Sequence, residues 1–424
     1  MTRAPTIRAY LCAILATGLL AAPALATNGY FANGYGGQSK AMAGAGVAVP
    51  TGVLGMAQNP ATGVRVGNRA GVCLTTFAPD RDVTIQPGGP LVEGKVTSDN
   101  PVFFIPCGGA NRTLGDRSSL GAFVFANGGM NTEFSPNFLA RFAPPGSASQ
   151  EVGVNLEQAF FTLNYAHRAS ERLTLGVSPI FAVQRFRAKG LQGFSGLSAR
   201  PGDLTNRGHD WSTGFGVNLG LLYEAGPQWT IGAAYRSRIA MSSFSKYRGL
   251  FAGGGDFDIP AMLTLGVAYP PRAAPDWTIT GEFQRIHYGD IDAIANTSAP
   301  PGGPLGAPNG VGFGWQDVDV WRLAAIWRKS DRLTLRGGVS YSTEFIDNPG
   351  DVVINTLAPG TPQWHLSAGG SYAITDRWSF TFAYTHAFSN AFTGTNPALT
   401  GGAPQRVRIR MHQNEIATGL SYRW

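Results

Sequence analysis

Apolar and polar residues alternate along most of this chain instead of gathering into long apolar runs. Between Arg332 and Phe345, the odd positions are mainly Leu, Val and Tyr, and the even positions are mainly Thr, Arg and Ser. Successive side chains of a β-strand point to opposite faces, so this pattern predicts strands with one apolar and one polar face.

Five related phrases punctuate the alternation and predict tight turns between strands. They are Glu171-Arg-Leu-Thr-Leu175, Pro227-Gln-Trp-Thr-Ile231, Pro275-Asp-Trp-Thr-Ile279, Asp331-Arg-Leu-Thr-Leu335 and Asp376-Arg-Trp-Ser-Phe380. The opposite ends of the hairpins are joined by much longer segments rich in Gly and Pro. The phrases define strands at 154–167 with 172–187, 211–224 with 228–241, 257–269 with 276–289, 318–328 with 332–346, and 363–373 with 377–388. Further alternating stretches lie at 66–79, 95–106, 118–127 and 406–424, which brings the prediction to about fourteen strands.

Short turns on one side and long loops on the other predict an all-β, antiparallel transmembrane barrel. Trp321 and Trp327 stand at the two ends of one apolar strand face, as in an interfacial aromatic girdle. Only 14% of residues are charged, yet mean hydropathy is −0.04, because the alternation dilutes the apolar face. A soluble β-sandwich also alternates, but it would turn its aromatic side inward.

The first 26 residues predict a cleaved secretory signal peptide. The apolar stretch from Ala9 to Ala22 follows Arg3 and Arg8 and precedes Ala24-Leu-Ala26, a small-x-small cleavage pattern. Loss of these two arginines lowers the formal net charge from +7 to +5. The last residue, Trp424, resembles the terminal aromatic signal that outer-membrane assembly machinery recognises, so we expect a multi-pass barrel in the outer membrane of a Gram-negative cell.

The mature chain keeps two cysteines, Cys73 and Cys107. If the intervening loop turns near Pro90, paired residues have numbers that sum to 180, and the two cysteines then face each other. A disulfide fits the oxidising periplasm, whereas a slip of one residue would leave two free thiols on opposite faces. Both outcomes stay open.

Residues 27–63, which we call the hatch, differ from the barrel region 64–424. Glycines interrupt the hatch, and its one periodic piece, Ser39–Val47, predicts at most a short helix. Its apolar content favours a plug inside the lumen over a floppy leader, since exposed apolar residues would be poorly solvated.

The hatch also carries a family resemblance. The run from Gly34 to Gly46, followed by Gln58-Asn-Pro-Ala61, resembles the N-terminal hatch of the FadL/TodX (OMPP1) outer-membrane transport proteins. The likeness extends through Ile259-Pro-Ala-Met262, the stretch 364–373 and Trp424. It implies a plugged fourteen-stranded barrel that carries long-chain fatty acids or other hydrophobic molecules inward.

The resemblance implies three candidate sites. The third and fourth outer loops, at about 188–210 and 242–256, would form a capture groove, although these side chains also suit simple packing between loops. The groove residues would be Leu191, Phe194, Leu197, Phe244, Tyr247, Leu250 and Phe251. The hatch segment Asn59, Pro60 and Ala61 would lie beside a lateral opening at a kink of the third strand, for which Gly121, Gly128 and Gly129 are candidates.

A fatty-acid carboxylate would need a cation in the lumen. Alternation turns Arg336 and Arg322 inward, and a guanidinium can pair with a carboxylate through two hydrogen bonds. Lumenal arginines also pair with acids of the hatch or wall, which is their commoner fate.

Other functions find less support in the sequence. No HExxH, GxSxG or Cys/His metal spacing is present, so no cofactor, metal or catalytic residue is expected, although a barrel lipid hydrolase is not excluded by spacing. An open diffusion porin needs rings of charged residues in its lumen, whereas the inward positions here are mainly Ser, Thr and Gly. The apolar residues of the outer loops argue mildly against an adhesion barrel, which does not need them. No basic stripe predicts nucleic-acid binding. The expected partners are fatty acids, alkanes or aromatic hydrocarbons, outer-membrane lipid and lipopolysaccharide, and the assembly machinery, around a monomer.

Overall fold

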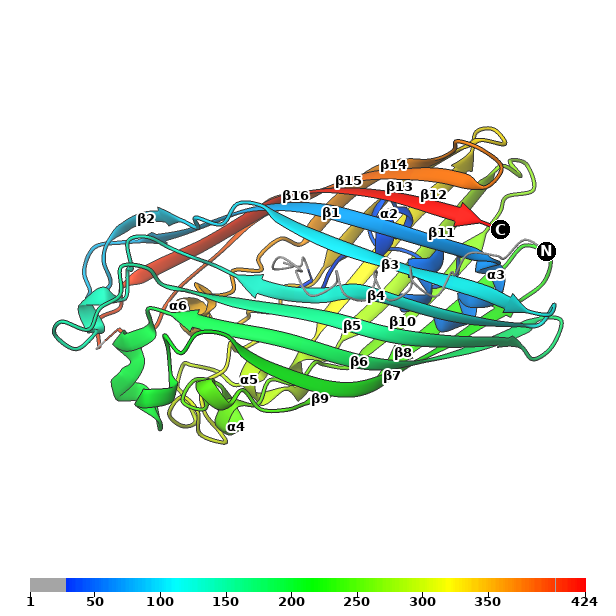
Figure 1. Ribbon diagram of the computed structural model, residues 1–424. Coiled ribbons are helices and arrows are strands. Elements are labelled where there is room, and N and C mark those ends of the chain that lie inside the picture. The colour runs from blue at the N-terminus through cyan, green and yellow to red at the C-terminus, as the bar shows by residue number, and fades with distance from the viewer. Residues whose placement is uncertain (1–27, 401) are drawn as a thin grey trace, which may run out of the picture.

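The structure, a computed structural model, describes residues 28–400 and 402–424 as one closed antiparallel β-barrel (Figure 1). The predicted signal peptide lies outside the described residues. Within the described residues, no helix is long and apolar enough to cross a membrane. Consecutive strands pair around the ring, and β16 closes it against β1. The fourteen ring strands are β1 (Arg69–Ile85), β3 (Phe103–Leu114), β4 (Ser118–Asn131), β5 (Gly153–Arg168), β6 (Leu173–Lys189), β7 (Asp210–Glu224), β8 (Thr230–Arg236), β10 (Met262–Tyr269), β11 (Trp277–Ile286), β12 (Val318–Arg328), β13 (Leu333–Ser342), β14 (Trp364–Ala373), β15 (Trp378–Thr395) and β16 (Arg406–Arg423).

Two short strands lie outside the ring: β2 (Gly94–Thr97) pairs with β1, and β9 (Ala240–Met241) pairs with β7. The predicted strand 95–106 is therefore wrong, because the ring strand in this region is β3. Pro106 lies where β3 has only β1 beside it, an edge position that tolerates a residue without an N–H. The predicted strands 228–241 and 257–269 are too long toward the loops, since β8 ends at Arg236 and β10 begins at Met262.

The alternation of faces is confirmed. On β12, Trp321 and Leu323 are 45% and 56% exposed on the outer face, whereas Arg322 and Ala324 are 4% and 3% exposed in the lumen. The five turn phrases all lie at the barrel end that holds the C-terminus, and the long loops lie at the other end (Figure 1).

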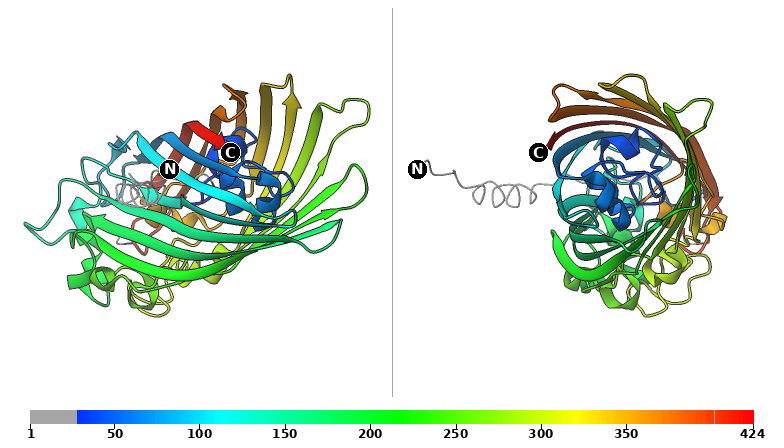
Figure 2. Two further views of the ribbon diagram at one scale, coloured as in Figure 1. Left: turned by 45° about the vertical axis from the view of Figure 1, so that its right-hand side comes forward. Right: turned by 90° about the vertical axis from the view of Figure 1, so that its right-hand side faces the viewer.

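The hatch fills the lumen, as the view along the barrel shows (Figure 2). It contains α2 (Gly36–Lys40), η2 (Val53–Ala57) and η3 (Pro60–Thr62), and α3 (Gly63–Val66) leads into β1. The helix expected over 39–47 is misplaced: Ala43 and Gly44 adopt positive φ angles of 52° and 90°, which end the helical path.

Glycines on the lumen face of the wall let the hatch backbone approach closely. A Cβ at Gly176 would overlap Pro60 and Ala61, and one at Gly232 would overlap the carbonyl of Val47. The wall is therefore shaped by contact with the hatch main chain.

The outer loops carry short helices that cover the far end of the lumen (Figure 1). They are η4 (Ala140–Phe142), η5 (Leu191–Leu197), η6 (Pro201–Asp203), η7 (Ser245–Tyr247), α4 (Ala252–Gly255), η8 (Tyr288–Asp290), α5 (Asp292–Ala295), η9 (Pro349–Asp351) and α6 (Val352–Asn355).

Candidate functional site

The barrel wall is interrupted between β3 and β4. Backbone pairing of the two strands covers Gly108–Leu114 and Ser118–Val124 and ends there. Farther toward the outer loops, β4 keeps β5 on one side only, and its register with β5 shifts between Ala126 and Gly128. Such a shift marks a β-bulge, which bends a strand away from its neighbour. We call residues 125–131 the free edge of β4.

Three residues of the hatch occupy this free edge. The Ala32 amide donates to the Asn127 carbonyl over 3.0 Å, and the Gly129 amide donates to the Tyr30 carbonyl over 2.9 Å. Phe31 forms an antiparallel bridge with Gly128. We call Tyr30–Ala32 the gate strand, because it completes the pairing that β3 leaves open.

Two of the three candidate glycines lie at the bulge. Gly128 allows close approach of the gate strand, because a Cβ there would overlap the Tyr30 carbonyl oxygen. Gly129 donates to that same carbonyl. Gly121 lies in the regular part of β4, where a Cβ would be 2.8 Å from Cε of Met56 in the hatch. Gly121 thus makes room for the hatch, and it does not contribute to the bulge.

Asn127, the extra residue of the bulge, points into the lumen and joins three elements. Its Oδ1 accepts hydrogen bonds from Arg236 Nη1 over 2.7 Å and from the Tyr35 hydroxyl over 3.0 Å. Its Nδ2 donates to Gln158 Oε1 over 2.9 Å. A cavity of about 20 Å³, room for about one water, lies beside this group between Tyr35, Phe125 and Ala126. The gate strand covers the free edge of β4 in this structure.

Aromatic side chains of the outer loops hold the start of the hatch. The Tyr288 hydroxyl donates to the Asn28 carbonyl over 2.6 Å and accepts from the Tyr30 amide over 3.1 Å. The Trp315 ring lies 5.3 Å from that of Tyr288 and 4.6 Å from that of Phe345, centroid to centroid. These contacts fix the gate strand to the outer loops.

The Asn59-Pro60-Ala61 segment lies away from the bulge. Asn59 donates to the carbonyls of Val47 and Leu221 over 2.7 and 3.0 Å, and it caps η3 by accepting from the Ala61 amide. Gly176, which contacts Pro60 and Ala61, pairs with Ala166, whereas Ala159 pairs with Ala126 at the bulge. Seven residues of β5 therefore separate the two levels, about 23 Å of strand. The gate strand lies beside the bulge, whereas the Asn59–Ala61 segment packs against the wall near the turn end of the barrel.

The two candidate arginines differ in what they already bind. Arg322 forms a buried ion pair with Glu282 over 2.8 Å, and Glu282 also accepts from the hatch amides of Gly46 and Val47. Arg336 donates to Ser371 over 2.9 Å and to Gln38 over 3.3 Å. Arg322 therefore pairs with an acid of the wall and helps to hold the hatch, as lumenal arginines commonly do.

The candidate groove residues are mostly buried against one another. Leu197 alone among the seven is exposed, at 39%; Leu191, Phe194, Phe244, Tyr247, Leu250 and Phe251 are each at most 5% exposed. The ring of Phe186 lies 4.9 Å from that of Tyr247 and 4.7 Å from that of Phe251. In this structure the third and fourth loops are joined by an apolar core, so a groove requires their separation.

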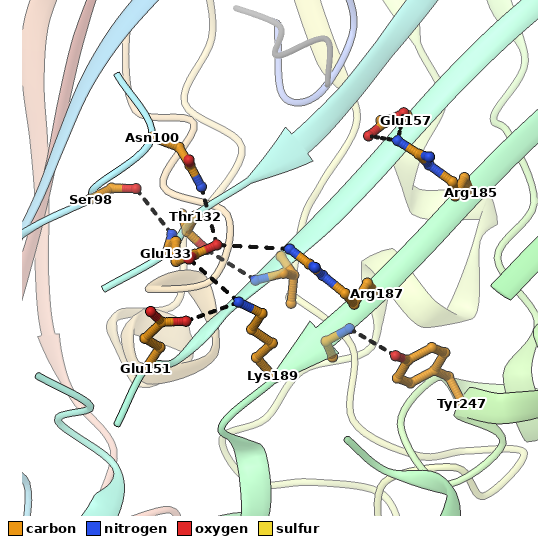
Figure 3. A network of polar contacts seen from close by, with 12 residues as sticks. Ser98, Asn100, Thr132, Glu133, Glu151, Glu157, Arg185, Arg187, Lys189 and Tyr247 are labelled. Atoms are coloured by element: carbon orange, nitrogen blue, oxygen red, sulfur yellow. Dashed lines mark hydrogen bonds and ion pairs between the residues drawn. The ribbon is translucent and has the colours of Figure 1, made fainter. Parts of the chain in front are cut away.

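A charged network joins the loop between β4 and β5 to the outer part of β6 (Figure 3). Lys189 pairs with Glu133 and Glu151 over 3.4 and 2.9 Å, and Arg185 pairs with Glu157 over 2.7 Å. The hydrogen bond from Lys189 lowers the pKa of Glu151 below its ordinary value. An open cavity of about 390 Å³ lies between Glu151 and Lys189. These residues fix the loop between β4 and β5 to the end of β6.

Cys73 and Cys107 face each other across β1 and β3. Their Cα atoms lie 5.0 Å apart and the structure joins them in a disulfide. The two strands have the predicted register, in which the numbers of paired residues sum to 180.

Comparison of the sequence with known protein families agrees with this structure of a plugged barrel with an interrupted wall. A family model described as "Outer membrane protein transport protein (OMPP1/FadL/TodX)" matches residues 13–424. The chain belongs to this family. The family's members are transport channels rather than enzymes, and the protein is an outer-membrane transporter of hydrophobic compounds.

Relatives of this FadL/TodX family member are similar over most of its length. A long-chain fatty acid transport protein of Escherichia coli O6:H1 is 24% identical over 360 residues, which cover 74% of this chain and 77% of the relative. A protein of the same description from Salmonella typhi is 24% identical over 328 residues, 70% and 72% of the two chains.

Solved structures share the fold. The Pseudomonas putida toluene transporter TodX superposes with a TM-score of 0.70 at 19% identity, covering 92% of this chain and 99% of that one. A Pseudomonas aeruginosa FadL homologue gives 0.69 at 15% identity, covering 93% and 99%.

Several residues at the gap were not among the predicted site residues. Tyr30 and Phe31 precede the recognisable hatch motif, and Tyr288 and Trp315 come from loops without a periodic pattern. Asn127 directly precedes Gly128-Gly129, a pair that indicates a bulge, but the sequence does not predict that the Asn127 side chain points into the lumen.

Proposed function

We propose that this protein takes up long-chain fatty acids passively across the outer membrane, through a lateral opening between β3 and β4 that the gate strand closes. The observation that carries the proposal is the pairing of Tyr30–Ala32 with the free edge of β4. Only a few backbone hydrogen bonds hold this edge, so its release costs far less than breaking a continuous ladder between two barrel strands.

Capture begins at the outer loops in this proposal. The apolar core around Phe186 joins the third and fourth loops, and an acyl chain can replace the contacts between them. Burial of an acyl chain contributes about 0.8 kcal/mol per methylene, so the transfer from water needs no catalytic group and no external energy source.

The proposal chooses fatty acids from two kinds of cargo. The curated relatives are described as long-chain fatty acid transport proteins, and the similar solved structures include toluene transporters. The relatives in sequence support fatty acids, whereas the solved structures at 15–20% identity support the fold alone.

We also propose that residues 1–26 are removed during export, that the assembly machinery reads the terminal Trp424, and that the barrel works as a monomer in contact with lipopolysaccharide. These proposals rest on the sequence alone.

The test compares a gene-deletion strain with the same strain carrying the gene, using radiolabelled oleate and toluene as separate probes. We expect the gene to raise oleate uptake, and mass spectrometry of the purified protein to find co-purified fatty acid. Equal uptake of both probes with and without the gene would refute the function, and a gain for toluene alone would refute the choice of cargo.

A further inference from the structure

Arg236 at the end of β8 is a buried cation with three of its five N–H donors unused. The side chain is 1% exposed. Nη1 donates to Asn127 over 2.7 Å and to the Tyr35 hydroxyl over 3.4 Å. Nε and Nη2 have no hydrogen-bond partner within the described residues.

No carboxylate among the described residues neutralises Arg236. The buried cations Arg322 and Lys40 pair with Glu282 and Glu415, whereas no acid among the described residues lies within ion-pair distance of Arg236. Residues 1–27 and 401 contain no Asp or Glu, so the rest of the sequence cannot supply a side-chain carboxylate either. A buried charge without a partner is costly, and in proteins it is normally paired or bound to a ligand.

The two unused atoms form one geometric unit. In a guanidinium, the Nε–H and the Nη2–H lie on the same edge and point in parallel, which matches the two oxygens of a carboxylate. Two aromatic rings lie against the guanidinium, whose carbon is 4.7 Å from the ring centre of Phe31 and 5.2 Å from that of Phe160.

The position of the edge ties it to the lateral opening. Asn127, which holds Nη1, is the bulge residue of β4, and Phe31 belongs to the gate strand. The Tyr30 hydroxyl nearby also has no hydrogen-bond partner in the described chain. Displacement of the gate strand therefore takes the Phe31 ring off the Arg236 guanidinium and moves the Tyr30 hydroxyl with it, at the point where the wall opens.

We propose that the Nε and Nη2 edge of Arg236 binds the carboxylate of the transported molecule, so that Arg236 selects carboxylic amphiphiles over neutral hydrocarbons. The inference rests on the proposed function and names its specificity-determining residue. The acyl chain then lies against the aromatic side chains around the bulge, among them Phe125 and Phe160, whose rings lie 5.4 Å apart.

The test measures equilibrium binding of radiolabelled laurate and of dodecanol, its neutral counterpart, to the purified full-length protein in non-ionic detergent. We expect Arg236→Gln to weaken laurate binding about 10- to 100-fold and to change dodecanol binding less than about twofold. Arg236→Lys should give an intermediate loss, because it keeps the charge and lacks the paired donors. Below the pKa of laurate, the difference between wild type and Arg236→Gln should disappear.

The matched control is the double variant Arg285→Gln with Asp319→Asn, which removes an arginine on the exposed face of β11 that already has an acid partner. Laurate affinity should be unchanged in this control. An unchanged laurate affinity in Arg236→Gln, or an equal loss for both probes, would overturn the inference and leave the proposed function standing. If wild type binds neither probe, the proposed function fails as well. Should Arg236→Gln not fold, the laurate-to-dodecanol ratio of Arg236→Lys decides.

Discussion

At the scale of single residues, the wall glycines record where the hatch main chain touches the barrel. Gly128 is the sharpest case, because its missing side chain leaves room for the Tyr30 carbonyl on the free edge of β4. The size of residue 128 therefore decides how firmly the gate strand is seated.

We predict that Gly128→Ala loosens the gate strand without unfolding the barrel. The added methyl overlaps the Tyr30 carbonyl, and such overpacking typically costs about 1–3 kcal/mol, which displacement of the gate strand relieves. Faster amide exchange at Ala32 and faster uptake of the proposed cargo are the expected results. Gly337→Ala on β13 is the control, since a Cβ there meets only the Ser367 carbonyl at 3.6 Å. Unchanged exchange at Ala32 in the Gly128 variant would contradict the role of the gate strand.

Alternation predicts which way a residue points but not what it meets. It placed Arg322 and Arg336 in the lumen, and both lie there. The acid beside Arg322 comes from β11 and the hatch amides come from residues 46 and 47, contacts that no local pattern encodes. Cys73 and Cys107 are different, because the register of one antiparallel pair can be counted through a single loop.

At the scale of elements, the strands with aromatic outer faces were predictable and the loops were not. The period of two gives β12 to β14 and the start of β15 within a few residues, since lipid contact imposes the pattern, whereas β15 continues to Thr395 beyond the predicted end at 388. The prediction of a strand at 95–106 is wrong because β3 contains Pro106 and the pair Gly108-Gly109 and lacks that pattern. The loop helices fold on contacts between loops, and these contacts have no sequence period.

One such contact makes a loop sensitive to pH. Asp351, at the end of η9, is buried and accepts hydrogen bonds from the Ser298 amide and hydroxyl over 2.6 and 2.7 Å. Burial raises the pKa of Asp351, although the hydrogen bonds from Ser298 and Thr297 oppose the rise. The folded carboxyl therefore holds its proton more tightly than the unfolded one.

We predict that the docking of loop 343–363 weakens as pH rises. The contribution of Asp351 is fully present below its unfolded pKa of about 3.9 and is lost as pH rises through the higher folded value. Amide exchange of this loop, corrected for the intrinsic rate at each pH, should show protection falling over that interval. Asp351→Asn keeps the size and cannot ionise, so its profile should be flat. An equal fall in this variant would assign the effect to another group.

At the scale of the whole molecule, two separate parts of the chain close the lumen. Outer loops that carry Tyr288, Trp315 and Phe345 cover one end, and the hatch fills the interior toward the turns (Figure 2). The two are joined by the hydrogen bonds of Tyr288 to Asn28 and Tyr30. A polar solute therefore has no straight route along the axis, and the sideways route that we propose for hydrophobic molecules lies at the free edge of β4, behind the gate strand.

We predict that removal of residues 28–63 converts the barrel into an ion-conducting pore. Barrels of 16–18 strands hold aqueous channels, and a ring of fourteen with Arg322, Glu282 and Glu415 in its lumen becomes wet once the hatch is gone. In planar bilayers we expect steady ohmic current from the deletion variant and none from wild type. The Gly337→Ala variant, with its hatch intact, should also be silent. Steady current through wild type would contradict the closed lumen, and a silent deletion variant would place the barrier to ions in the outer loops instead of the hatch.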